Sequence, residues 1–126
     1  MKFTLYTADC IGSLSNSIYP NKHIVTDETS MKAAAEFDHV TAEYKNNLSS
    51  DNVPMDCDND HSDDPNDWVT PLEVAMAFPG VEFVVVYSRN HMLPKSGKTA
   101  RPRFHVYFPI SPITESTEYT ALKKQI

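Results

Sequence analysis

The segment 103–108 reads Arg-Phe-His-Val-Tyr-Phe, and its alternation is the clearest structural signal in the chain. Regular alternation of apolar and other residues is typical of a β-strand that is buried on one face. The alternation predicts a half-exposed strand. Its core side would carry Phe104, Val106 and Phe108, and its open side Arg103, His105 and Tyr107.

A second strand is expected where the chain reads Val-Pro-Met-Asp-Cys-Asp, at residues 53–58. Successive side chains of a strand point to opposite faces, so the two aspartates would leave on the same side, about 7 Å apart at the backbone. Cys57, which lies between them, is expected to be buried and inert. The pattern therefore places Val53, Met55 and Cys57 on one face and Asp56 and Asp58 on the other.

Two further strands and three helices are expected. Residues 2–7 mix aromatic and β-branched positions, and the apolar run 83–87 is typical of a central strand buried on both faces. Asp27 can cap a helix that ends near Asp38. Thr70 and Glu73 form a capping box around Pro71, and Pro79-Gly80 ends that helix. Residues 114–125 have helical composition and a cationic end.

These elements predict an α+β fold with a small, mainly antiparallel sheet flanked by short helices. A chain of 126 residues with 40% hydrophobic composition suits a single domain spanning residues 1–126. Cys10 and Cys57 lack CxxC spacing, which argues against structural zinc and a disulfide framework. Neither a membrane span nor a signal peptide fits, so we expect a soluble, cytoplasmic protein without a membrane partner.

The net charge of −6 is distributed unevenly. Seven aspartates lie between Asp51 and Asp67, whereas the segment 83–114 contains no acidic residue. Two interpretations stay open: a pair of solvated loops of opposite sign, or a basic loop that closes over the phosphates of a nucleotide or template. The cations of that segment are Arg89, Lys95, Lys98, Arg101 and Arg103.

The aspartates of residues 53–58 are the first candidate site. Asp56 and Asp58 could both reach a hard cation such as Mg²⁺ or Mn²⁺, although acidic pairs of this kind are also common on surfaces. His105, with Arg103 two positions before it, suits hydrogen bonding and charge pairing to a triphosphate.

Two other site types are tested by spacing. Asp56, Asp58, Asp60 and Asp67 fall at positions 1, 3, 5 and 12 of a calcium-binding EF-hand loop, but His61 stands where the turn needs glycine, and position 12 lacks the usual glutamate. The run Ser-Gly-Lys-Thr at 96–99 resembles the end of a P-loop, but Met92 replaces the required glycine.

Segments 55–64, 87–92 and 100–110, taken together, resemble the catalytic region of archaeo-eukaryotic-type primases, especially the primase–polymerases of phages and integrated mobile elements. The resemblance implies a partial, RRM-like primase–polymerase core that binds a nucleoside triphosphate, a DNA template and Mg²⁺ or Mn²⁺. By this resemblance the metal ligands are Asp56 and Asp58, acting with His105 as catalytic residues; the nucleotide-binding residues are Ser88, Arg89, Arg103 and His105; and the nucleic-acid-binding residues are Lys95, Lys98 and Arg101.

That family has a third metal carboxylate on a later strand, which this sequence lacks: the acids after His105 are Glu115 and Glu118, in the expected terminal helix. Two functional hypotheses follow. The chain is a nucleotidyltransferase core for primer synthesis in DNA replication, whose activity as an isolated chain stays open. Alternatively, it is a non-catalytic mobile-element protein that binds and inhibits a host defence nuclease, as anti-CRISPR proteins do.

Overall fold

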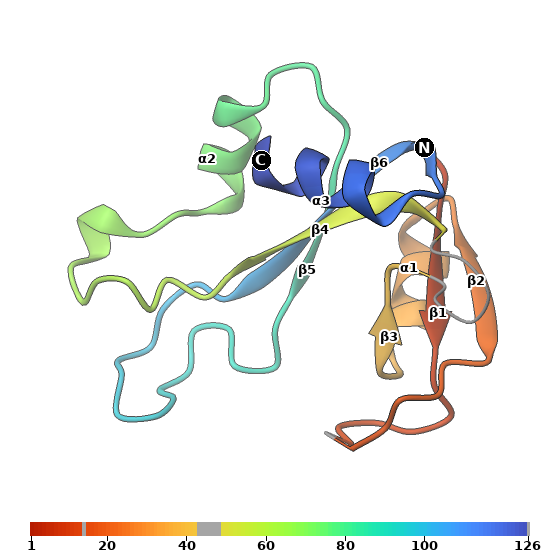
Figure 1. Cartoon of the computed structure of the whole chain (residues 1–126). Coiled ribbons are helices and arrows are strands. Elements are labelled where there is room, and N and C mark those ends of the chain that lie inside the picture. The colour runs from red at the N-terminus through yellow and green to blue at the C-terminus, as the bar shows by residue number, and fades with distance from the viewer. Residues whose placement is uncertain (14, 43–48, 126) are drawn as a thin grey trace. The chain divides into compact units, whose positions relative to one another are not determined.

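A computed structural model describes residues 1–13, 15–42 and 49–125. The chain divides into two compact units: unit 1 comprises Met1–Val53 with Pro109–Ile126, and unit 2 comprises Pro54–Phe108. Each unit is described by itself below. The predicted α+β class is confirmed, but the described strands form two three-stranded sheets rather than one (Figure 1).

The first sheet belongs to unit 1 and has β1 (Phe3–Thr7) at its centre, between β2 (Asn21–Val25) and β3 (His39–Val40). Both outer strands pair antiparallel with β1. The sequence predicted β1 but not its neighbours, because β2 is mostly exposed and polar and β3 has only two residues. The core of this unit is built from Phe3, Leu5, Val25, Met31 and Ala34.

Helix α1 (Glu28–Ala35) packs on β1 and β2. Its predicted start is confirmed, since Oδ1 of Asp27 accepts a hydrogen bond from the Ser30 amide at 2.8 Å. The helix ends before the predicted Asp38, because the backbone of Asp38 instead bonds to that of Ala8 and Cys10. Helix α3 (Ser116–Gln125) forms where the sequence predicted it, and its buried Tyr119 donates from its hydroxyl to the carbonyl of Asn52.

The second sheet has the order β4-β6-β5, formed by β4 (Ser50–Cys57), β6 (Phe104–Ile113) and β5 (Val84–Tyr87). Strands β5 and β6 are antiparallel, with Val86 opposite His105 and Tyr87 opposite Phe104. The expectation of a central, fully buried β5 was wrong. The central place is taken by β6, which leaves β5 half-exposed at the edge of the sheet.

In unit 2 a short 3₁₀ helix, η1 (Pro65–Asp67), precedes α2 (Pro71–Ala77). The predicted capping box of α2 is confirmed: the Thr70 hydroxyl accepts from the amide of Glu73, and the Glu73 carboxylate accepts from the amide of Thr70. The rings of Phe78 and Phe83 pack on that of Phe108, with centroids 5.1 and 5.9 Å apart. These contacts form the apolar core of unit 2 together with Val74 and Val106.

Among the helices of the described ranges, none is long and apolar enough to cross a membrane.

Candidate functional site

Asp56 lies near the end of β4, and its carboxylate faces His105 on β6, the neighbouring strand. Oδ1 of Asp56 is 3.6 Å from Nδ1 of His105, and the two side chains are 65% and 45% exposed. Asp56 and Asp58 were both expected beside His105 on neighbouring strands, and the structure confirms this for Asp56.

Fewer side chains are exposed around His105 than the sequence predicted. Tyr107, two residues along β6, is 4% exposed. Burial, and then the negative charge of Asp56, raise the pKa of the Tyr107 phenol to about 12. Arg103 is also buried, at 2% exposed. The expectation that Arg103 and Tyr107 share an exposed face with His105 was therefore wrong.

Asp58 is exposed just beyond β4, and its carboxylate is oriented by its own loop. Oδ1 of Asp58 accepts from the amide of Asp60 at 3.0 Å, an interaction that holds an Asx turn. The buried Asn59 has φ +57°, and its side-chain amide donates to the carbonyls of Val69 and Pro102. Asn59 thereby anchors the loop that carries Asp58.

Arg103 pairs with Asp60, with Nη1 lying 2.8 Å from Oδ1 of the carboxylate. Burial works against ionisation of Asp60, but the adjacent Arg103, together with Lys98 and Arg101, outweighs it and lowers the pKa of Asp60 below 3.8. Arg103 therefore pairs with the partly buried Asp60 and does not present its guanidinium to solvent. The Arg103 side chain is too buried to contact a phosphate from solvent, as its expected nucleotide-binding role would require.

Arg101 is fully buried and acts as a clamp on the loop 58–64 between β4 and η1, called the acidic loop below. Its Nη1 donates to the carbonyls of Asn59 and Ser62, both at 2.9 Å, and its Nη2 lies 2.8 Å from Oδ1 of Asp63. Its guanidinium also stacks 5.3 Å from the centre of the Trp68 ring. Its Nε donates to the carbonyl of Thr99 at 3.1 Å, so all three guanidinium nitrogens are used and Arg101 is not available to a nucleic acid.

The basic and acidic segments thus pair with each other, which differs from both interpretations that the sequence left open. Nζ of Lys98 donates to the carbonyl of Asp60 at 3.1 Å, so this cation also points toward the acidic loop. Opposite charges a few ångströms apart attract each other, so Lys98, Arg101 and Arg103 are already paired with aspartates of the same unit. Of the expected phosphate-binding cations, Arg89 and Lys95 remain exposed.

Short turns order the loop between β5 and β6. The Ser88 hydroxyl accepts from the amide of Asn90, and the Ser88 amide donates to the carbonyl of Arg103. Ser96 and Gly97 have φ values of +50° and +78°, and the backbones of Lys95 and Lys98 bond to each other in both directions. That combination is typical of the type I′ turn of a two-residue hairpin, which accounts for the Ser-Gly pair without a phosphate ligand.

Cys57 is half-buried rather than fully buried as predicted. Burial, and then the charges of Asp56 and Asp58, raise the pKa of its thiol above 9.0. A thiol held in its neutral form is a poor nucleophile, so the expected low reactivity of Cys57 has a physical basis in its neighbours.

Asp56 and Asp58 are carboxylates, the ligand type that Mg²⁺ and Mn²⁺ prefer. Within the described part of the chain, no three His, Cys, Asp or Glu side chains cluster as a metal site. Mg²⁺ is commonly held by one or two carboxylates, with substrate phosphates and water completing the shell. The calcium-loop alternative is weaker, because Asp60 pairs with Arg103 and Asp67 accepts a hydrogen bond from Ser62.

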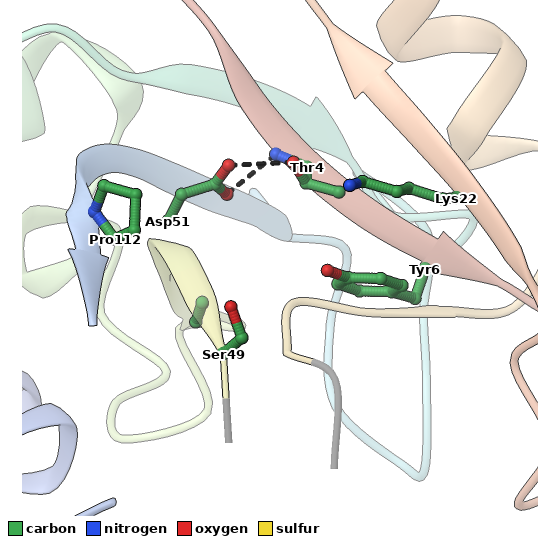
Figure 2. Close-up of a pocket in the computed structure, with 7 residues that line it drawn as sticks. Thr4, Tyr6, Lys22, Ser49, Asp51 and Pro112 are labelled. Atoms are coloured by element: carbon green, nitrogen blue, oxygen red, sulfur yellow. Dashed lines mark hydrogen bonds between the residues drawn. The ribbon is translucent and has the colours of Figure 1, made fainter. Parts of the chain in front are cut away.

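Unit 1 contains a separate polar cavity of about 200 Å³ (Figure 2). Asp51 lies beside it, but Oδ1 and Oδ2 of Asp51 accept from the amide and hydroxyl of Thr4, both at 2.8 Å. This carboxylate therefore joins β4 to β1 within unit 1. The cavity is lined by Thr4, Tyr6, Lys22, Ser49, Ser50, Asp51 and Pro112.

Asn59 and Trp68, which contribute to the clamp on the acidic loop, were not expected from the sequence, and neither was the contact between the tilted rings of Tyr87 and His91. The runs of opposite charge were a signal for the clamp, since two such runs in one small unit can pair. Tyr87 and His91 are four positions apart and lie on either side of a turn. Their spacing predicts a ring contact only once that turn is known.

Fold and site define a small α+β protein with an exposed Asp–His pair on a three-stranded sheet and an adjacent arginine-clamped acidic loop. Comparison with models of known protein families, with curated proteins and with solved structures gave no match.

Proposed function

We propose that this chain is a primase–polymerase-type nucleotidyltransferase core that binds a nucleoside triphosphate together with Mg²⁺ or Mn²⁺ at Asp56, Asp58 and His105. The observation that carries the proposal is the 3.6 Å approach of the Asp56 carboxylate to the His105 imidazole on adjacent strands. The likeness of the three sequence segments to archaeo-eukaryotic-type primases supports the same assignment.

The bound cation would neutralise the triphosphate and lower the barrier to attack by a primer hydroxyl. Asp56 and Asp58 offer carboxylate oxygens to it from the same end of β4. With Nδ1 of His105 turned toward Asp56, Nε2 is the ring nitrogen left to face a phosphate oxygen, and it would donate to that oxygen when the imidazole is protonated on both nitrogens. Asp56 would thus both hold the cation and face the imidazole of His105.

The acidic loop positions Asp58 at this site. Asp60 supplies the amide that orients Asp58, and the same residue is held by Arg103 and Lys98. Arg101 fixes the loop by binding the carbonyls of Asn59 and Ser62. We therefore assign Arg101, Arg103 and Lys98 to positioning, and assign contact with template phosphates to the exposed Arg89 and Lys95.

A site with two carboxylates should hold the cation weakly until a nucleotide adds its phosphate oxygens. Calorimetric titration of a non-hydrolysable nucleoside triphosphate, with and without Mn²⁺, tests this dependence. We expect heat of binding only when both are present. Asp56→Asn and Asp58→Asn should each weaken binding at least tenfold, because each removes one charge.

The asparagine at position 58 can still accept from the amide of residue 60, so the loop should keep its conformation. Glu82→Gln, which neutralises another exposed carboxylate of unit 2, is the matched control and should bind as the wild type does. Binding that is absent from the wild type, or equal in all four proteins, would contradict the proposal.

A second candidate is inhibition of a host defence nuclease by protein–protein binding. The observation in its favour is that Leu72 and Met76, one turn apart on α2, are both strongly exposed. An inhibitor would bind its target equally well after Asp58→Asn, and would lose affinity when Leu72 and Met76 are replaced by serine.

A further inference from the structure

Tyr87 and His91 form a supported aromatic surface at the end of β5. Their ring centroids are 4.2 Å apart with the planes inclined at 38°, and Tyr87 is 56% exposed. His91 is fixed from behind, since its Nδ1 accepts from the backbone amide of Arg103 at 3.2 Å and its own amide donates to the carbonyl of Ser88. One face of the tyrosine is thus covered by a fixed ring, and more than half of the residue is open to solvent.

Apolar side chains continue this surface along the loop. Met92 and Leu93 are both about half exposed. Met92 has φ +55°, a conformation that bulky residues rarely adopt, and it is held there by a 2.9 Å bond from its amide to the carbonyl of Arg101. The loop is therefore held in a conformation that keeps these two side chains out of the core.

The segment that carries the aromatic surface is positively charged. Segment 83–114 has no acidic residue, and its inward cations Lys98, Arg101 and Arg103 are matched to Asp60 and Asp63. No described carboxylate pairs with Arg89, which lies between the two rings in sequence, or with Lys95, which stands at the I′ turn.

We infer that Tyr87, backed by His91, is a stacking platform for a base of a single-stranded nucleic acid, whose phosphates are bound by Arg89 and Lys95. Exposed aromatic rings beside unpaired cations are the combination that binds single strands without sequence preference, because every base has a flat apolar face. The inference rests on the proposed function only for the role of that strand as the template.

Fluorescence anisotropy with a labelled dT₂₀ oligonucleotide in EDTA and low salt tests the platform without metal or nucleotide. We expect Tyr87→Ala to weaken binding about tenfold and Tyr87→Trp to preserve it, because the larger ring also stacks. Arg89→Gln and Lys95→Gln should each reduce the slope of log affinity against log salt by about 0.7. Ile18→Ala and Lys124→Gln, at exposed residues of unit 1, are the controls and should leave both quantities unchanged.

Two results would overturn the inference: equal affinity of Tyr87→Ala and wild type, including no binding by either, or a Tyr87-dependent self-association in sedimentation that oligonucleotide does not compete with. The second would assign the surface to another copy of the chain.

The metal-free design separates this test from the proposed function. If Mn²⁺ and nucleotide bind in a manner that depends on Asp58, but Tyr87→Ala leaves oligonucleotide affinity unchanged, only the stacking platform is contradicted. If Tyr87→Ala weakens oligonucleotide binding, but Mn²⁺ and nucleotide do not bind, only the nucleotidyltransferase proposal is contradicted.

Discussion

Arg103 and Asp60 form an ion pair in which Nη1 lies 2.8 Å from Oδ1, and only 3% of the Arg103 side chain is exposed. Nε and Nη2 of Arg103 have no hydrogen-bond partner among the described residues, so Asp60 is the principal partner of this buried charge. The same Asp60 orients Asp58 through its amide. The pair therefore joins the stability of unit 2 to the geometry of the candidate site.

The first prediction concerns the pH dependence of that pair. Because the pKa of Asp60 is lower in the folded state than its ordinary value of 3.8, its stabilising effect should be fully present above pH 3.8. The effect should be lost as the pH falls through the lower folded value. Thermal unfolding of wild type and Asp60→Asn should differ at pH 6 and converge in strong acid. A difference between the two that grows on acidification would show that the sign is wrong, and Glu82→Gln should show no such dependence.

A second prediction concerns the buried Arg101. Arg101→Met keeps an unbranched side chain but removes the guanidinium, which leaves the carbonyls of Asn59 and Ser62 without their donors. Removing one partner of a buried charged network costs about 3 kcal/mol, which urea denaturation would detect as a lower midpoint. Arg89→Met, at an exposed position, should change the free energy of unfolding by no more than about 0.5 kcal/mol. Equal effects of the two substitutions would refute the structural role of Arg101.

The third prediction concerns the rate at which the Cys57 thiol is labelled. It is measured in the Cys10→Ser variant, in which Cys57 is the remaining cysteine. Burial and the charges of Asp56 and Asp58 raise the pKa of Cys57, so little thiolate is present at pH 8. Reaction with a disulfide reagent should be several-fold slower in the native protein than in denaturant. Asp56→Asn with Asp58→Asn should accelerate the native reaction, whereas Glu82→Gln should not. A native rate equal to the denatured rate would mean that neither burial nor the two charges protects the thiol.

The sequence by itself determined the elements whose signals are local. The capping residues Asp27 and Thr70 bond to amides three positions away, so both helix starts could be predicted from short motifs. The alternation along 53–58 likewise placed Asp56 and Asp58 outward. The nearness of Asp56 to His105 was expected as well, from motifs on two strands and from their resemblance to a known family.

Tertiary structure alone decided which strands are neighbours and which charges are open. Strand β5 lies at an edge because β6 has β4 as its other partner, and no property of the apolar run 83–87 specifies that place. Arg101 and Asp63 are 38 positions apart, and composition could not show that they meet. Burial and pairing depend on which distant residue comes to lie opposite. The sequence could therefore suggest a phosphate-binding basic loop, whereas the fold used most of its cations to hold the acidic loop beside Asp58.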